Sequence, residues 1–488
     1  MSELAFASAL ELAEKIRRRE ITCESLLDHY LERVDKYNGK LNAIVVDVRD
    51  RALEQARAAD AALKSASKGG RAIGPLHGVP MTIKESYNLA GTPTTWGNPD
   101  WRDNVPTEDA ESVRKLKDAG AIVFGKTNVP ISLADFQSYN DVYGTTNNPY
   151  DHSRIPGGSS GGSAAALAAG LTGLEAGSDI GGSIRNPAHF CGVFGHKPTH
   201  NLVWMRGHSP PGDMRGTPDI SVIGPLARSA ADLETVLRLL AGPDHIASRG
   251  YRLNLPEMPA KGLHDLRIAV WKEDEMCPVS AEVAARVDKV ADACRAAGAR
   301  VDMDARPDFT STHSHEVYQN LLQTTMASRM PDESYESLKS YVATLSPDDD
   351  SSTAQVLRAQ VASFKDWSRN NELRHHLRWK WHAFFDDYDV VLTPIMPTAA
   401  FPHDHRPFGE RTLQVDNDTR PYFEQVFWAG LSGVSYLPST VIPTGLNGAG
   451  LPIGVQFIGP EFGDLITIGV ARALEAEGFR FTPPPAYL

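Results

Sequence analysis

Apolar residues follow two patterns along this chain, one with helical spacing and one of short continuous runs. Helical spacing predicts helices over residues 5–19, 22–39, 51–65, 110–119, 163–169, 281–297 and 465–477. Continuous apolar runs predict buried strands over residues 42–48, 81–83, 121–124, 267–271, 300–303, 390–393 and 453–458. Because strands and helices alternate, the pattern predicts an α/β fold built in layers.

Two segments interrupt this alternation. Residues 204–218 are rich in proline and glycine and follow neither pattern, whereas the segment 310–385 is polar and mostly helical. No internal repeat or low-complexity linker marks a domain boundary, so we expect residues 1–488 to form one domain. Within that domain, the segment 310–385 is expected to be a peripheral helical insertion.

The composition is that of a globular protein with an acidic balance. Apolar residues make up 41% of the 488 residues, which is enough for a large core. The net charge of -12 argues against a nucleic acid as the main partner. The four cysteines lack C-x-x-C spacing and no apolar run reaches the length of a membrane span. We therefore expect a cytoplasmic protein with reduced thiols and no membrane partner.

Two pairs of histidines raise the question of a metal site. His313 and His315 form one pair, and His403 and His405 form the other. Neither pair has a third and fourth ligand in register, and polar loops often carry such pairs. We therefore expect no metal and no cofactor.

Two glycine-dense runs carry the strongest chemical signal in the chain. They read Gly157-Gly158-Ser159-Ser160-Gly161-Gly162-Ser163 and Ser178-Asp179-Ile180-Gly181-Gly182-Ser183-Ile184-Arg185. Glycine loses the most backbone freedom on folding, so such runs indicate backbone that must approach something closely. Serines within them point to a nucleophile beside a set of amide donors.

A serine hydroxyl needs a base, and the residues alone leave that base open. The histidines nearest to the glycine runs are His77, His189 and His196, and none has a setting that marks it as catalytic. The alternative is Lys84 at the end of the apolar run 81–83, because burial lowers the pKa of a lysine and favours its neutral form.

Several ordered motifs resemble the amidase signature family. They are Gly78-Val79-Pro80-Met81-Thr82-Ile83-Lys84-Glu85, Gly125-Lys126-Thr127-Asn128, the two glycine-serine runs, Cys191-Gly192-Val193-Phe194-Gly195-His196-Lys197-Pro198-Thr199, Gly224-Pro225-Leu226-Ala227-Arg228-Ser229 and Gly450-Leu451-Pro452-Ile453-Gly454-Val455-Gln456. The resemblance covers roughly residues 5–240 and 385–485, and it implies the fold of that family, a large mixed β-sheet flanked by helices. His196 departs from the leucine that many members carry, which indicates a change in the pocket or in packing, and packing is favoured.

The resemblance implies a Ser-Ser-Lys triad. Ser183 matches the nucleophile, Lys84 the base, and Ser159 the bridging serine that follows a cis peptide bond in that family. The backbone amides of residues Ile180, Gly181, Gly182 and Ser183 match the oxyanion hole. Asp179 and Arg185 are expected to tie the loop down rather than to react.

Two further assignments concern the neighbourhood of this triad. The run Gly157-x-Ser159-x-Gly161 also fits the G-x-S-x-G elbow of α/β-hydrolases, which would make Ser159 the nucleophile. The doubled glycines and the second serine cluster argue against that reading. Gln137, Ser138 and Tyr139 are candidates for lining the substrate pocket, although a polar loop without a ligand has the same appearance.

The implied function is that of an amidase that cleaves the C–N bond of a small or aryl amide, with carbamates and esters open to the same acyl chemistry. The first alternative is the A subunit of a glutamyl-tRNA(Gln)/aspartyl-tRNA(Asn) amidotransferase, which releases ammonia from glutamine within a complex. The second is a catalytically inactive scaffold, against which the intact Lys84, Ser159 and Ser183 argue. The expected partner is a small-molecule amide, and a homodimer is left open.

Overall fold

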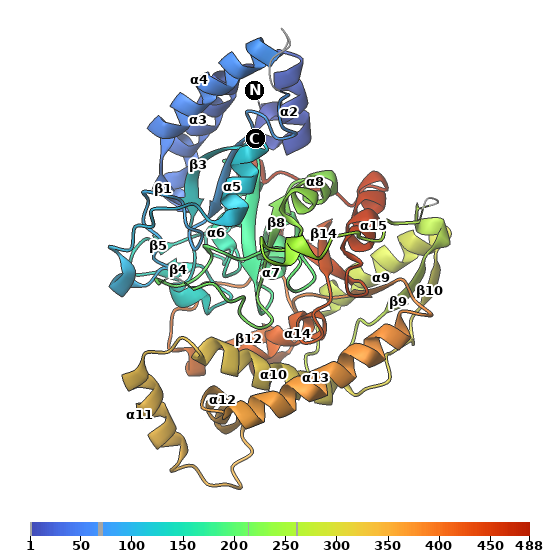
Figure 1. Ribbon diagram of the computed structural model, residues 1–488. Coiled ribbons are helices and arrows are strands. Elements are labelled where there is room, and N and C mark those ends of the chain that lie inside the picture. The colour runs from blue at the N-terminus through green and yellow to red at the C-terminus, as the bar shows by residue number, and fades with distance from the viewer. Residues whose placement is uncertain (1, 67–71, 213, 260–261) are drawn as a thin grey trace.

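A large mixed β-sheet forms the centre of the molecule (Figure 1). The computed structural model describes residues 2–66, 72–212, 214–259 and 262–488, and within them the sheet has eight strands in the order β10–β9–β11–β15–β14–β7–β8–β6. Strand β9 runs parallel to β10 and β11, whereas the other neighbours are antiparallel. The strands are β6 (Glu175–Asp179), β7 (Phe194–Lys197), β8 (Val222–Ala227), β9 (Arg267–Val270), β10 (Arg300–Asp302), β11 (Val390–Thr393), β14 (Ser439–Leu446) and β15 (Pro452–Ile458).

A smaller sheet lies beside the free edge of the large one. It contains β1 (Ile44–Asp47), β3 (Ile122–Thr127) and β2 (Pro80–Lys84), in that order. Backbone hydrogen bonds from Thr82 N to Leu174 O at 3.3 Å and from Gly173 N to Pro80 O at 3.1 Å join β2 to the segment leading into β6. This junction brings Lys84, the last residue of β2, next to β6.

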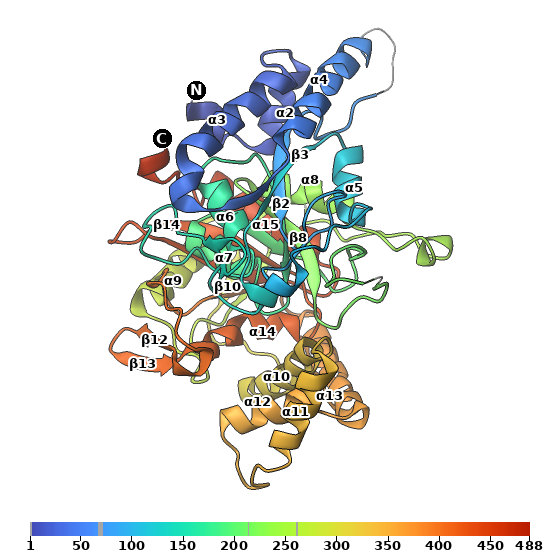
Figure 2. The same cartoon turned by 90° about the vertical axis from the view of Figure 1, so that its left-hand side faces the viewer.

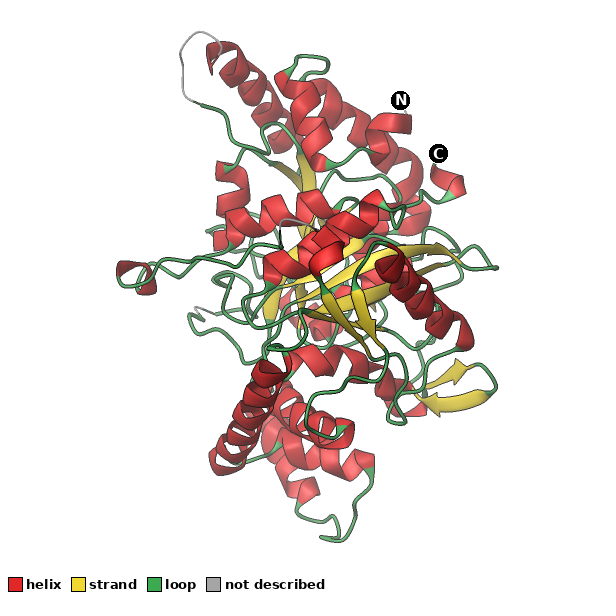
Figure 3. Cartoon of the chain, turned by 90° about the vertical axis from the view of Figure 1, so that its right-hand side faces the viewer, coloured by secondary structure: helices red, strands yellow, loops and turns green. Residues whose placement is uncertain are grey.

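Helices cover both faces of the large sheet, as Figure 3 shows. On β7, a Cβ atom at Gly195 would lie 2.9 Å from Ala188 of α7 (Arg185–Cys191), whereas the adjacent His196 bonds Asp464 of α15 (Asp464–Ala476). Because successive residues of a strand face opposite sides, α7 and α15 cover opposite faces. Double coverage explains why every residue of β7 is buried.

The other helices surround this core. They are α1 (Ser2–Phe6), α2 (Ala9–Arg17), α3 (Cys23–Leu41), α4 (Arg49–Ala66), α5 (Glu111–Asp118), α6 (Gly161–Ala168), α8 (Ala230–Leu240), α9 (Ala281–Ala296) and α14 (Phe427–Gly433). Two short hairpins, β4 (Tyr139–Asn140) with β5 (Gly144–Thr145) and β12 (Thr412–Val415) with β13 (Asp418–Pro421), lie outside the sheets. No helix in the described part of the chain has both the length and the apolar character needed to cross a membrane.

One predicted helix end was wrong. We expected the helix after Thr22 to end at Gly39, but α3 continues to Leu41. Thr22 caps its start as expected, by accepting a hydrogen bond from Ser25 N. The helix ends at Asn42, whose φ of 52° is the left-handed conformation that terminates helices. Asparagine tolerates this conformation better than most other residues, so it replaces glycine as the stop.

The segment 310–385 folds into helices that lie together below α14 (Figure 2). They are α10 (Ser311–Ala327), α11 (Asp332–Val342), α12 (Ser352–Gln360) and α13 (Phe364–Phe384). The segment reaches the core through α10, where Tyr318 packs so closely on Gly430 of α14 that an added Cβ atom would lie 2.5 Å from its ring. Part of this helical segment therefore borders the centre of the molecule.

Candidate active site

Lys84 is buried at the end of β2, between two serine hydroxyls. Its Nζ atom lies 2.6 Å from Ser159 Oγ and 2.9 Å from Ser178 Oγ. Burial lowers the pKa of Lys84 to about 7, although Asp179 and Glu175 act in the opposite direction. A lysine in this state is neutral in about half of the molecules at pH 7 and can then accept a proton.

The first glycine-serine run forms a tightly enclosed loop at the start of α6. A Cβ atom on Gly158 would lie 2.4 Å from Asp135 O, and one on Gly161 would lie 2.3 Å from Ser138 Oγ. Side chains at these positions would therefore push the neighbouring segment away. The peptide bond between Gly158 and Ser159 is cis.

Hydrogen bonds join the two glycine-serine runs. Ser160 N donates to Ser183 O at 3.1 Å, and Asn186 of α7 receives a hydrogen bond from Gly158 N at 3.0 Å. Ser183 is 7% exposed, and its hydroxyl makes no hydrogen bond with any described residue. The structure thus brings Lys84, Ser159 and Ser183 together and leaves the Ser183 hydroxyl without a partner in the described part of the chain.

The turn that carries Ser183 contains backbone amides with different hydrogen-bond states. Gly182 has a φ of 101°, a conformation that favours glycine, and its amide donates to Asp179 Oδ1 at 2.9 Å. The hydrogen bonds of the described residues leave the amides of Ile180, Gly181 and Ser183 without an acceptor. Three of the four amides expected in an oxyanion hole are therefore free, and the fourth holds the turn.

The ion pair between Asp179 and Arg185 holds this turn in place, as expected from the sequence. Arg185 donates to Asp179 through Nε at 3.0 Å and Nη2 at 2.9 Å, and both side chains are fully buried. Burial alone would raise the pKa of Asp179, but the charge and hydrogen bonds of Arg185 outweigh burial and hold the pKa at about 2. The same carboxylate accepts from Ile184 N, so one ion pair orients the backbone on both sides of Ser183.

Three residues at this site were not found from the sequence. Ser178 shares Lys84 with Ser159, and Tyr318 of α10 donates from its hydroxyl to Ile180 O at 2.9 Å. His208 lies 2.9 Å from the Ser86 hydroxyl through its Nε2 atom. Ser178 stood within the second glycine run, but Tyr318 and His208 belong to segments with no recognisable motif.

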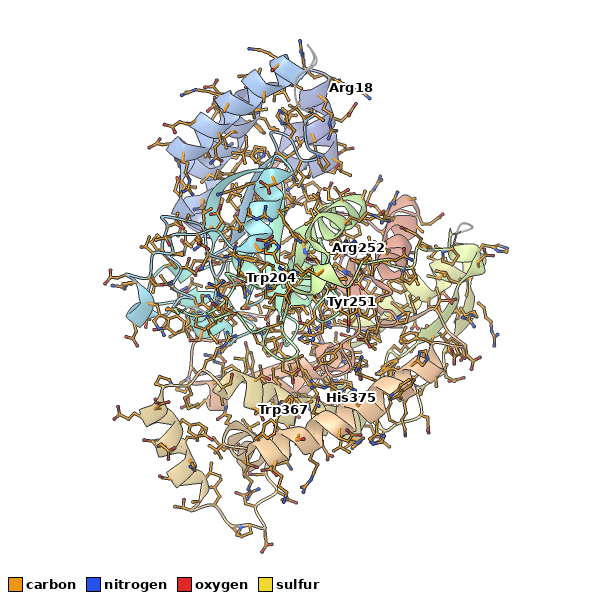
Figure 4. The ribbon with its side chains drawn as sticks, viewed as in Figure 1. Arg18, Trp204, Tyr251, Arg252, Trp367 and His375 are labelled. Atoms are coloured by element: carbon orange, nitrogen blue, oxygen red, sulfur yellow. The ribbon has the colours of Figure 1, made fainter. Side chains whose placement is uncertain are left out.

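The irregular segment 204–218 contacts the site through His208, which lies next to Ser86. The first residue of the segment, Trp204, packs outside the site. Trp204 packs edge-on against His245, with ring centroids 5.1 Å apart. Figure 4 shows Trp204 well above Trp367 and His375 of α13. Residues 204–208 therefore run from the loop that follows α8 to the residues that follow β2.

The predicted pocket residues have protein partners for their polar groups. Gln137 donates to Asp404 O at 2.8 Å and accepts from Asp404 N at 2.9 Å. The Ser138 hydroxyl donates to Gly157 O at 3.0 Å, and the Tyr139 ring stacks on His405 with centroids 3.8 Å apart. The Ser138 contact supports the first glycine-serine loop, and a pocket-lining role for Gln137, Ser138 and Tyr139 stays a prediction.

The alternative bases lie away from the two serines. His77 contacts Ala59 O at 3.1 Å, and His189 lies between Gly454 O and Thr398 O. His196 lies 2.8 Å from Thr440 Oγ1 and 3.1 Å from Asp464 Oδ1, which is the packing role expected for it. Among the residues that the structure describes, no group of three His, Cys, Asp or Glu side chains could hold a metal ion.

Comparison with known proteins agrees with this arrangement. The family model for Amidase matches residues 25–467. This chain belongs to the amidase signature family. It is 34% identical to the indoleacetamide hydrolase of Bradyrhizobium diazoefficiens over 478 residues, covering 96% of this chain and 86% of the relative. It is also 30% identical to the A subunit of the glutamyl-tRNA(Gln) amidotransferase of Moorella thermoacetica, covering 97% of each chain.

Solved structures of amidase signature enzymes share the fold. A bacterial aryl acylamidase of this family superposes with a TM-score of 0.80 at 23% identity, covering 99% of this chain and 97% of the other. A chain of a vestigial protein complex that reveals the evolutionary origins of an s-triazine catabolic enzyme superposes with a TM-score of 0.81 at 27% identity, covering 98% of this chain and 100% of the other. The protein is an amidase, a hydrolase that acts on carbon–nitrogen bonds of non-peptide amides.

Proposed function

We propose that the protein hydrolyses a small amide with an aryl group, using Ser183 as nucleophile, Ser159 as proton relay and Lys84 as base. The observation that carries this proposal is the position of Lys84, buried and 2.6 Å from Ser159 in a loop bonded to the backbone of Ser183. A buried lysine with a pKa near 7, hydrogen-bonded to hydroxyls rather than to a described carboxylate, has the properties of a general base.

Acylation moves one proton along the three side chains. Ser183 Oγ attacks the carbonyl carbon as its proton passes to Ser159, while the Ser159 proton passes to neutral Lys84. The C–N bond then breaks, and the proton held by Lys84 returns through Ser159 to the leaving nitrogen. Water attacks the ester formed on Ser183, and the same relay restores the serine hydroxyl.

The turn from 180 to 183 stabilises the oxyanion in this proposal. The free amides of Ile180, Gly181 and Ser183 donate to the developing negative charge, and Gly182 gives the turn its shape. The loss of one such donor costs about 3–4 kcal/mol in barrier height in other serine hydrolases. No cofactor is needed, because the relay and the amides supply both the proton transfer and the charge stabilisation.

The substrate class is supported by the names of two similar proteins, an indoleacetamide hydrolase and an aryl acylamidase. Both names describe amides with an aromatic group, one on the acyl side and one on the amine side. Carbamates and esters pass through the same type of acyl-enzyme, so we include them as further substrates. The four cysteines are buried and unpaired, which fits our expectation of a cytoplasmic enzyme.

Covalent labelling with a fluorophosphonate tests the triad. Ser183→Ala should abolish both labelling and turnover, because no oxygen remains to attack. Ser159→Ala should lower labelling and kcat by about 10³-fold or more, since removal of a catalytic base or its relay has effects of this size. Ser178→Ala is the matched control, because Ser178 also contacts Lys84 but lies outside the relay, and we expect a loss of about tenfold or less. Persistent labelling of Ser183→Ala would rule out this nucleophile.

The amidotransferase A subunit is the second candidate, favoured by relatives of that name that match nearly the whole chain. Such a subunit releases ammonia from glutamine as part of a complex. The purified chain should therefore be assayed alone on glutamine and on a panel of aryl and aliphatic amides. Hydrolysis of an aryl amide without partners supports the proposed function, whereas activity restricted to glutamine and dependent on added partner proteins supports the alternative.

A further inference from the structure

Helix α10 brings two side chains to the surroundings of the candidate active site. Tyr318 donates to Ile180 O at the turn that carries Ser183. Arg329, just after the end of α10, lies with its guanidinium carbon 5.8 Å from the ring centroid of Trp96. The helix advances roughly 1.5 Å per residue, so these two contacts are well separated along it.

Arg329 is a half-buried cation without an acidic partner. Among the residues that the structure describes, it makes no hydrogen bond and no ion pair, and its contact is with the Trp96 ring. Burial lowers the pKa of Arg329, and no described carboxylate acts against this effect. The chain has 61 acidic and 49 basic residues, so a half-buried arginine that pairs with none of the described acids is unexpected.

His208 lies beside the same tryptophan and also has an unused hydrogen-bonding atom. The side chain is 3% exposed, its ring lies 5.3 Å from that of Trp96, and its Nδ1 atom is buried without a partner among the described residues. Burial lowers the pKa of His208 well below its usual value, and the charges of Lys84 and Arg329 lower it further. Arg329 and the catalytic lysine therefore both lie within electrostatic range of this one imidazole.

The neutral imidazole can act as a donor toward a ligand. Ser86 Oγ lies 2.9 Å from His208 Nε2, so the hydroxyl can donate to Nε2 while Nδ1 carries the proton. Ser86 follows Lys84 by two residues. The His208 Nδ1–H group and the Arg329 guanidinium then both lie beside the Trp96 ring as donors with no acceptor among the described residues.

We propose that Arg329 and His208 bind a carboxylate carried by the amide substrate. The guanidinium is a planar set of donors that matches both carboxylate oxygens, and His208 Nδ1 adds a third hydrogen bond. Trp96 holds the guanidinium by its ring face, and Glu85 fixes Trp96 in turn by accepting from Trp96 N at 2.8 Å. This inference rests on the proposed function and narrows its substrate class to amides with an anionic group.

Matched pairs of anilides test the preference on each side of the scissile bond. On the acyl side, the 4-nitroanilide of glutaric acid carries a free carboxylate and that of hexanoic acid is neutral. On the amine side, 4-acetamidobenzoate is charged and 4-methylacetanilide is neutral. We expect the wild-type kcat/KM to favour the charged member of at least one pair by about tenfold or more, which is the size of a charge-assisted hydrogen bond.

Three variants separate recognition from packing. Arg329→Met keeps an unbranched side chain over Trp96 without the charge and should lower the charged-to-neutral ratio of kcat/KM by about tenfold or more. Arg329→Lys should retain part of that ratio, because lysine keeps the positive charge but lacks the planar guanidinium that can donate to both carboxylate oxygens. Arg306→Met is the control, since Arg306 stacks on Trp271 in the same manner at 5.1 Å and should leave the ratio unchanged.

The outcomes separate this inference from the proposed function. An equal ratio in the wild type and Arg329→Met overturns the inference while turnover of the anilides still supports the function. If no anilide is hydrolysed, the same compounds are compared as protectants of Ser183 against fluorophosphonate labelling, and equal protection by charged and neutral members overturns the inference. If neither turnover nor labelling occurs, the proposed function fails and the inference fails with it.

Discussion

At the scale of single residues, the proposed chemistry depends on how burial changes the charge of Lys84. A solvent-exposed lysine is almost fully protonated at neutral pH and cannot accept a proton from serine. Here the surrounding protein removes water from Nζ, and the nearest groups are the hydroxyls of Ser159 and Ser178 rather than carboxylates. Glu85, the next residue, turns away and accepts hydrogen bonds from Thr95 N and Trp96 N.

This environment predicts a specific pH dependence. Lys84 is protonated below its pKa of about 7 and neutral above it, so kcat/KM should rise with pH through about 7 and fall about tenfold per unit below. The rate of fluorophosphonate labelling of Ser183 should follow the same curve, because attack on the probe uses the same base. Both rates are measured from about pH 5 to about pH 9, a range that brackets this pKa.

Another buried lysine provides the control for this curve. Burial lowers the pKa of Lys126 to about 8, but its Nζ atom donates to Pro93 O and Thr94 Oγ1 rather than to a catalytic serine. In Lys126→Met the ascending limb should therefore stay at the pKa of Lys84, about 7. An ascending limb of the kcat/KM curve near pH 10.5, the ordinary pKa of lysine, would exclude Lys84 as the base. A labelling rate that is independent of pH would exclude it as well.

At the scale of secondary structure, α10 links the helical segment 311–384 to the catalytic turn. The hydrogen bond from the Tyr318 hydroxyl to Ile180 O holds the carbonyl next to the amides of the turn. Gly430 makes this approach possible, since a side chain at that position would meet the Tyr318 ring. The helix therefore acts on the orientation of the amides proposed to stabilise the oxyanion.

Tyr318→Phe tests this link by removing one hydroxyl. The loss of one hydrogen bond of about 1 kcal/mol should lower kcat by roughly fivefold with little change in KM, because the turn contacts the transition state more than the bound substrate. Tyr388→Phe removes a comparable hydroxyl that donates to Asp302 at 2.6 Å and should leave kcat unchanged. A rise in KM with kcat unchanged in Tyr318→Phe would contradict this role of Tyr318.

Whether a strand was predicted from the sequence depends on how apolar that strand is. The apolar runs in β11 and β15 were predicted within one residue of their ends. Strand β14 was missed because Pro443 and Gly445 interrupt its apolar pattern. In the folded protein, Thr444 Oγ1 donates a hydrogen bond to Ile453 O on the neighbouring strand β15. Strand β6 was missed because it is polar, and its buried Glu175 and Asp179 find side-chain partners outside the strand, on Thr82 and Arg185.

At the scale of the whole molecule, the site is assembled from segments far apart in the sequence. The resemblance of several ordered motifs to the amidase signature family pointed to Lys84, Ser159 and Ser183 as the expected triad. Tyr318 and His208 could not be found in this way, since their roles arise from contacts with Ile180 O and Ser86 across the fold. The resemblance thus supplied the three proposed catalytic groups, whereas the surrounding residues depend on the tertiary arrangement.

The helical segment is also joined to the core by an ion pair at α13. Arg374 is 1% exposed and donates to both oxygens of Asp219, at 2.7 and 2.8 Å. Its guanidinium lies 4.4 Å from the ring centroid of Tyr436, whose hydroxyl also donates to Asp219 at 2.7 Å. The Asp219 carboxylate therefore connects its own loop to α13 and to the loop before β14.

Arg374→Met should destabilise the whole protein through this connection. Removing one partner of a buried pair leaves the Asp219 charge poorly compensated and lowers the free energy of unfolding by about 3–5 kcal/mol. Arg378→Met is the control on the same helix, because Arg378 also lies over Tyr436. Arg378 pairs with Glu461 in a more exposed position, with side-chain exposures of 27% and 26%. Its loss should therefore lower the free energy of unfolding by about 1 kcal/mol or less. Denaturant unfolding measures both values, and hydrogen exchange should rise in residues 204–220 and 364–384 of Arg374→Met alone. Equal losses in the two variants would show that the segment is held by general packing rather than by this ion pair.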